Sequence, residues 1–127
     1  EMIRIGLTTT PEQPDPTRSD SHAWSAHPNY HLLATVLGVR PDSPGFRTVE
    51  IAPAMGEFRR ASGVVPHPLG DISVALELDD EGELSADIAL PPGVSGLFKW
   101  NCNVIEINPG RASLRLNPAT THCVDMN

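Results

Sequence analysis

Basic residues, aromatic residues and long apolar runs are all scarce in this 127-residue chain. Nine Lys and Arg stand against 16 Asp and Glu, which gives a net charge of −7. Because phosphate backbones and anionic lipids are held by clustered basic side chains, this balance argues against nucleic-acid and membrane partners. No apolar run approaches the roughly 20 residues of a spanning helix. The composition predicts a soluble chain and leaves open whether it is cytoplasmic or secreted.

Cysteine is also scarce, with only Cys102 and Cys123 in the chain. Neither lies in a C-x-x-C or a zinc-ligand spacing, so we expect no metal site and no cofactor. Two cysteines without a framework pattern say little about the redox compartment. We expect both thiols to be free.

Proline and glycine, by contrast, are abundant. Thirteen prolines and ten glycines predict many turns and short elements, and they exclude long bundle helices. Pro28 clashes with a preceding helical turn, so we expect a short turn over residues 20–26 and a main helix from Pro28 to Gly38. Ser19 or Asp20 is predicted to cap the start. The spacing of apolar residues predicts one buried helix face, formed by Ala26, Tyr30, Leu33 and Leu37.

Beyond residue 45 the apolar period changes from helical to two. Residues 72–78 and 84–90 alternate around an acidic, glycine-containing turn, which predicts a hairpin with one buried face. Residues 104–107 and 112–116 are predicted to form a second hairpin, closed by Asn-Pro-Gly at 108–110. Shorter strands are expected at 47–52, 59–65 and 95–100, and a strand-like start at residues 3–7.

These elements predict a mainly β protein, an antiparallel β-sandwich of two small sheets preceded by a loop and one helix. A single helix before a complete sandwich has little to pack against. We therefore expect it to be the last helix of a larger helical domain whose earlier part is absent. The expected domains are residues 1–45, the end of that helical domain, residues 46–117, the sandwich, and a tail at 118–127.

Three segments carry a resemblance to a known family: TTTPEQPDPTRSDSHAWSAHPNY, ATVLGVRPDSPGF and VEIAP. Together they resemble the junction in bacterial α-L-rhamnosidases, where the last helix of an (α/α)6 catalytic barrel leads into a C-terminal antiparallel β-sandwich. VPHPLGDISV and LPPGVSG are similar to that family's C-terminal domain. The resemblance implies that the chain is the C-terminal part of a six-hairpin glycosidase, and that its partner is the upstream barrel of the same parent protein.

The family hydrolyses terminal α-L-rhamnosyl linkages with inversion, using a carboxylic acid and a carboxylate. By resemblance, Glu12 is the general base and His22 lines the sugar subsite, and the substrate is a rhamnose-containing oligosaccharide or glycoside. The general acid falls in the missing upstream region, so this chain alone is expected to be inactive. From the residues alone, Glu12 is most simply a solvated loop residue. His22 is then a residue that connects the loop to the start of the helix.

Three neighbours are candidates for substrate binding. Trp24 offers an apolar wall for the methyl group of a 6-deoxy sugar, although its position also fits core packing. Arg18 and Asp20 are expected to brace the loop through a charge-assisted contact or a helix cap. His27 and His31 stand four residues apart but have no third ligand in view, so we expect no zinc there.

A non-catalytic role is the alternative. The sandwich could bind carbohydrate by stacking on Trp100, or it could act as a rigid buttress for the barrel. A solvent-facing Trp100 ring would favour sugar binding, and a packed ring would favour the buttress.

Overall fold

The chain, described here by a computed structural model, is defined for residues 2–14, 16 and 18–118. It divides into two compact units, Glu1–Leu32 and Leu33–Asn127. Within the described residues, no helix has the length and apolar character that crossing a bilayer requires. The predicted boundary at residue 45 concerns the domains of the parent protein and stays a prediction.

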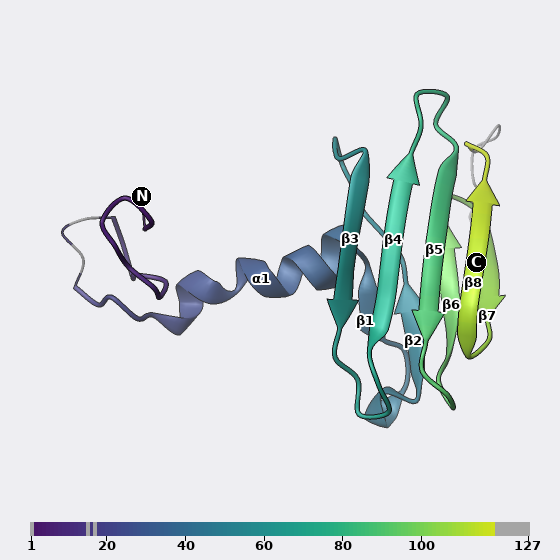
Figure 1. Cartoon of the computed structure of the whole chain (residues 1–127), viewed down its shortest axis with the longest axis horizontal. Helices are drawn as coiled ribbons and strands as arrows, with labels where there is room; N and C mark the ends of the chain where they lie inside the picture. Colours follow the sequence, from purple (N-terminus) through teal and green to yellow (C-terminus); the bar gives the residue numbers. More distant parts are fainter. Residues whose placement is uncertain (1, 15, 17, 119–127) are drawn as a thin grey trace, which may run out of the picture. The chain divides into compact units, whose positions relative to one another are not determined.

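The second unit is a β-sandwich of two four-stranded sheets (Figure 1). One sheet has the order β1-β2-β6-β7 and the other the order β3-β4-β5-β8. This confirms the predicted fold class, with eight described strands instead of about six. The strands are β1 (Val39–Pro41), β2 (Thr48–Ile51), β3 (Arg60–Val65), β4 (Ile72–Leu78), β5 (Leu84–Leu90), β6 (Ser95–Trp100), β7 (Asn103–Ile107) and β8 (Gly110–Leu116).

The predicted hairpin of alternating residues is confirmed as β4 and β5. Val74 pairs with Ile88 in an antiparallel register, and both side chains are buried. The acidic residues form the turn because the Asp79 carboxylate accepts a hydrogen bond from the Glu83 amide at 2.7 Å. The alternation of strand residues therefore sets which face meets the other sheet.

The second predicted hairpin is wrong. β7 pairs with β6 and β8 pairs with β5, so the turn at Asn108 and Pro109 crosses from one sheet to the other. The neighbouring hairpin is instead β6–β7, closed at Asn101 and Cys102, where Asn101 adopts a φ of 51°. Asparagine tolerates this left-handed conformation better than most residues. The sheets also contain a parallel pair, β2–β6, which an all-antiparallel prediction misses.

The core lies between the two sheets and is built from strand residues that point inward. Its largest fully buried side chains are Phe98, Leu37, Ile51, Ile72, Leu84, Val49 and Val94. Leu37 belongs to the segment before β1, and its terminal carbon lies 3.1 Å from where a Cβ on Gly63 would stand. The absence of a side chain at Gly63 thus leaves room for Leu37 to enter the core.

Two ion pairs that share Glu50 connect three strands of the first sheet on its outer face. The Glu50 carboxylate on β2 accepts hydrogen bonds from Arg40 on β1, at 2.7 Å, and from Lys99 on β6. The Lys99 hydrogen bond, with help from Arg40, lowers the pKa of Glu50 below its ordinary value, against the opposing effect of burial. The parallel junction of β2 and β6 is therefore braced by charge as well as by backbone hydrogen bonds.

The segment before the sandwich is helical in short pieces. A 3-10 turn, η1 (Ala23–Ala26), is followed by α1 (Pro28–His31) and a π-helical turn, η2 (Leu32–Val36). Pro28 opens α1, as expected. The expected side-chain cap by Ser19 or Asp20 is wrong, because η1 starts after His22 and makes no such bond.

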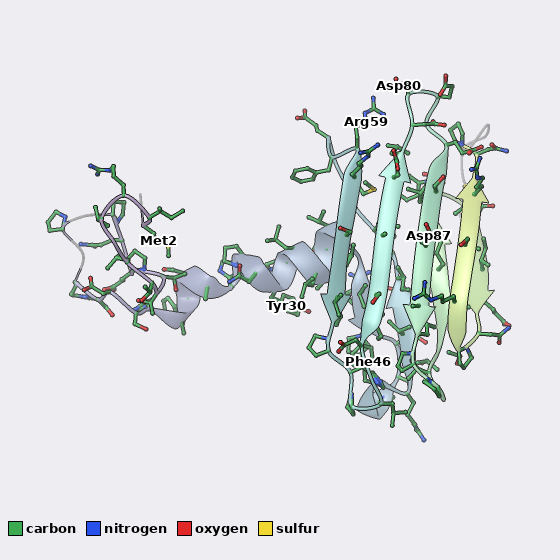
Figure 2. All side chains as sticks on the ribbon, viewed as in Figure 1. Met2, Tyr30, Phe46, Arg59, Asp80 and Asp87 are labelled. Atoms are coloured by element: carbon green, nitrogen blue, oxygen red, sulfur yellow. The ribbon has the colours of Figure 1, made fainter. Side chains whose placement is uncertain are left out.

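The predicted helix face does not remain one surface. Leu37 is buried and Leu33 packs against the sandwich core, whereas Tyr30 is 63% exposed. Figure 2 shows the Tyr30 side chain projecting from the helical segment. Residues 3–6 form turns and residue 7 belongs to no element, so the predicted strand-like start is wrong.

Cys102 is disulfide-bonded, which corrects the expectation of a free thiol there. Cys123 and the rest of the predicted tail from residue 119 onward lie outside the described residues.

Candidate functional site

The proline-rich loop of the first unit is closed at its base by backbone hydrogen bonds. The His22 amide donates to the Thr10 carbonyl at 2.7 Å, and the Glu12 amide donates to the Ser19 carbonyl at 2.9 Å. The Thr10 hydroxyl adds a bond to the His22 carbonyl at 3.1 Å. Prolines have no backbone N–H to donate, so the amides of His22 and Glu12 supply the backbone hydrogen bonds that close the loop. The loop thereby holds Glu12 and His22 on one short stretch of paired backbone.

Glu12 and Arg18 form a two-point ion pair across this loop. The Arg18 Nε donates to Glu12 Oε2 at 2.8 Å, and the Arg18 Nη2 donates to Glu12 Oε1. The Glu12 side chain is 20% exposed and that of Arg18 is 81% exposed. A guanidinium that grips both carboxylate oxygens fixes the plane of the carboxylate as well as its position.

This pairing leaves Glu12 able to act as a base. An ionised carboxylate has about four lone-pair sites, and the two bonds from Arg18 occupy one on each oxygen. The remaining sites can accept a hydrogen bond from a water molecule. Arginine does not give up its proton in proteins, so Arg18 stays a hydrogen-bond donor to this carboxylate.

His22 and Trp24 form an aromatic pair at the end of the loop. Their ring centroids lie 5.7 Å apart at an interplanar angle of 85°, an edge-to-face arrangement. Trp24 is 82% exposed and His22 is half-buried. An exposed indole face with an imidazole beside it can stack on an apolar sugar surface and exchange hydrogen bonds with a hydroxyl.

Asp20 is exposed, and its backbone carbonyl accepts a bond from the Thr9 hydroxyl. Among the described residues of the first unit, Asp20 is the only acidic residue besides Glu12. An inverting glycosidase places its two carboxyl groups about 6.5–9.5 Å apart, with the acid positioned on the leaving oxygen. In this loop the Thr9 hydroxyl therefore anchors Asp20 through its backbone.

The two helix histidines contact each other. The rings of His27 and His31 are 5.4 Å apart at 86°, and His27 Nδ1 is 2.8 Å from the Trp24 carbonyl. Across the part of the chain that the structure describes, no group of three or more His, Cys, Asp or Glu residues is placed to hold a metal ion.

Trp100, the sugar-stacking candidate of the sandwich, does not present an open ring face. Trp100 is half-buried and packs against the core, and its Nε1 is buried without a hydrogen-bond partner among the described residues. A shallow groove crosses the outer face of the second sheet, where Figure 2 shows Asp87 on β5. The groove is lined by polar residues such as Ser73 and Arg111 and by aliphatic residues such as Val64, and by none of the described aromatic ones.

Sequence reasoning predicted a bracing role for Arg18 but not its partner. The two residues are six positions apart across Pro14 and Pro16, and no helical or strand periodicity relates such positions. The opposite charges within one short loop were the available signal.

Comparison with known proteins places this fold. The α-L-rhamnosidase of Aspergillus terreus shares it with a TM-score of 0.78 and 19% identity, over 91% of this chain and 15% of that one. The α-L-rhamnosidase of Dictyoglumus thermophilum has a TM-score of 0.76 and 17% identity, over 92% of this chain and 17% of that one. The α-L-rhamnosidase of Streptomyces avermitilis, complexed with L-rhamnose, has a TM-score of 0.63 and 21% identity, over 91% of this chain and 13% of that one. The chain thus spans less than a fifth of each of these proteins. No curated protein matches its sequence significantly.

The fold of this chain, a β-sandwich preceded by a short helical segment, is therefore also found within these solved structures. Residues 38–99 match the family described as the bacterial alpha-L-rhamnosidase C-terminal domain. The match runs from just before β1 to β6, so most of the sandwich is similar to that family, in line with the resemblance of the sequence.

Proposed function

We propose that this chain is the C-terminal part of a glycoside hydrolase that cleaves terminal α-L-rhamnosyl linkages with inversion. Residues 1–45 form the end of the catalytic domain in this proposal, and residues 46–117 form the sandwich that follows it. The observation that carries it is an oriented carboxylate, Glu12, in a chain whose residues 38–99 match the rhamnosidase C-terminal family.

Glu12 is the general base in this proposal. Its free lone pairs accept a proton from a water molecule as that water attacks the anomeric carbon. The glycosidic bond breaks on the opposite face, and an acid from the upstream region protonates the leaving oxygen. The attack from the face opposite the leaving group gives the inverted configuration.

His22 and Trp24 supply the sugar subsite. The methyl group of a 6-deoxy sugar makes one side of the ring apolar, and the exposed Trp24 indole provides a matching flat surface. The His22 imidazole lies beside that indole, where it can exchange a hydrogen bond with a sugar hydroxyl. A rhamnose-containing oligosaccharide or glycoside is accordingly the proposed substrate.

The sandwich serves as a buttress and not as a sugar-binding module. Packing of Trp100 against the core supports this role, since a stacking platform requires an open aromatic face. The outer groove of the second sheet supports it as well, because its lining lacks an aromatic residue among those described.

The proposal predicts that the 127-residue chain alone does not hydrolyse rhamnosides, whereas the protein encoded by the complete gene does. A barrel of twelve helices cannot form from the helical segment present here, and inverting hydrolysis needs the missing acid. Release of the aryl group from an aryl α-L-rhamnoside measures the activity of the 127-residue chain and that of the complete protein. Turnover by the chain above that of its Glu12→Gln variant contradicts the prediction, and so does inactivity of the complete protein.

The first unit is predicted to bind hydrophobic dyes and to promote self-association of the isolated chain. Trp24, Tyr30 and Leu32 are all more than half exposed, and exposed apolar side chains of this size gather at contact surfaces. The double variant Tyr30→Ser, Leu32→Ser should reduce dye fluorescence and the sedimentation coefficient at high concentration. Leu69→Ser is the matched control, because Leu69 is 59% exposed on a sandwich loop. An equal effect of the control contradicts a role for the first unit.

A further inference from the structure

We infer that Arg18 is a positioning residue that acts through Glu12, and that it does not bind the sugar. This inference rests on the proposed function and deepens it. Its geometric basis is the two-point contact in which Arg18 Nε reaches Glu12 Oε2 at 2.8 Å while Nη2 reaches Oε1. Both donors that the fork presents on this side are therefore committed to the carboxylate.

Glu12 needs such a partner because a backbone contact alone does not orient a carboxylate. The Glu12 amide bonds to the Ser19 carbonyl at 2.9 Å, which fixes the backbone but not the plane of the side-chain carboxylate. A glutamate side chain that is not held in place loses conformational entropy when it adopts the one orientation in which it can accept a proton from water. Arg18 stands one residue before Ser19, so the same backbone contact brings the guanidinium to the carboxylate.

The Arg18 guanidinium also determines which lone pairs of the Glu12 carboxylate remain available to a water molecule. One site on each oxygen is used by Arg18, and the free sites lie on the edges turned away from it. A water molecule bound there meets a carboxylate of fixed plane and fixed charge. Lysine could supply the charge but not the fork, because an ammonium group has no planar pair of donors.

The test uses the complete enzyme and an aryl α-L-rhamnoside. Arg18→Gln is expected to lower kcat about 10²-fold with KM changed by less than about threefold, as a misplaced base loses the attack and not the binding of sugar. Arg18→Lys should fall between that variant and the wild type. Guanidinium ion added to Arg18→Ala should restore part of the lost kcat.

A double variant separates positioning from direct contact. If Arg18 acts only through Glu12, then Arg18→Gln introduced into the Glu12→Gln enzyme should cause no further loss of kcat. A further loss by the same factor, or a rise of KM at constant kcat, identifies Arg18 as a sugar ligand and overturns the inference. Arg18→Lys and guanidinium rescue keep the test decisive if the Gln variant does not fold.

Arg60→Gln is the matched control. Arg60 on β3 also grips a glutamate with its Nε and Nη2, at 3.0 Å and 2.5 Å from Glu77 Oε1, and both side chains are exposed. The Arg60→Gln variant should leave kcat and KM unchanged, since exposed ion pairs of this kind contribute little to stability. Loss of kcat on Arg18→Gln with normal kcat in Glu12→Gln would refute the proposed base and this inference together. Loss in Glu12→Gln alone refutes only the role of Arg18.

Discussion

Glu12→Gln in the complete enzyme is expected to lower kcat about 10²- to 10⁴-fold, the usual contribution of a general base. The amide keeps the size of the side chain and one acceptor oxygen, but it does not take a proton from water. KM should change little, because ground-state contacts to the sugar remain. Steady-state hydrolysis of an aryl α-L-rhamnoside, with circular dichroism to establish folding, measures the effect.

Azide distinguishes a lost base from a damaged site. In Glu12→Ala, a small anion can enter the space left by the shortened side chain and attack the anomeric carbon from the side of the missing water. The carbon–azide bond forms as the glycosidic bond breaks, and the upstream acid protonates the leaving oxygen. An inverting site then releases the β-azide from an α-rhamnoside. Formation of the α-azide, or near-normal kcat in Glu12→Gln, places the base elsewhere.

The strands were predictable where their alternation was long. β4 and β5 each have seven residues with alternate apolar positions, and their acidic turn is specified by residues only four apart. Local sequence therefore contains both the face and the register of this hairpin. The fold class follows from the same repeated pattern.

The pairing of the last strands was not predictable in the same way. A Pro-Gly turn after Asn108 is equally suited to a hairpin and to a crossing between sheets, and local residues do not choose between them. The choice depends on β8 completing the second sheet beside β5, a contact between residues such as Ala112 and Ile88 that lie far apart in sequence. Such non-local pairing has no signature within a short window.

Sequence resemblance supplied the candidate residues of the site but not the contacts between them. Resemblance pointed to Glu12 and His22, and the exposed ring of Trp24 is compatible with the expected sugar wall. The fork from Arg18 to Glu12 depends on how the proline-rich loop folds back, which fixed φ angles at several prolines restrict without determining. The contact between Arg18 and Glu12 could therefore not be predicted from the sequence.

Gly38→Ala is expected to give the largest loss of stability among single methyl additions to the sandwich. Gly38 has a φ of +78°, and a Cβ there would overlap the backbone of Ala52 and Pro53. A left-handed residue with a side chain costs about 1–2 kcal/mol. Overpacking in a filled interior costs about 1–3 kcal/mol more, and here the obstacle is backbone that cannot rotate away. Urea unfolding of the 127-residue chain should therefore show a loss of about 3 kcal/mol or greater.

Gly45→Ala separates the steric contribution from the conformational one. Gly45 has nearly the same φ, +73°, yet nothing lies within 4 Å of where its Cβ would stand. This variant should lose only the left-handed cost of about 1–2 kcal/mol. The difference between the two variants then measures the overlap at Ala52, whose amide donates to the Gly38 carbonyl at 2.9 Å and holds the two segments together. Equal losses would mean that this contact yields to a methyl group, and the close approach before β1 would then not constrain the fold.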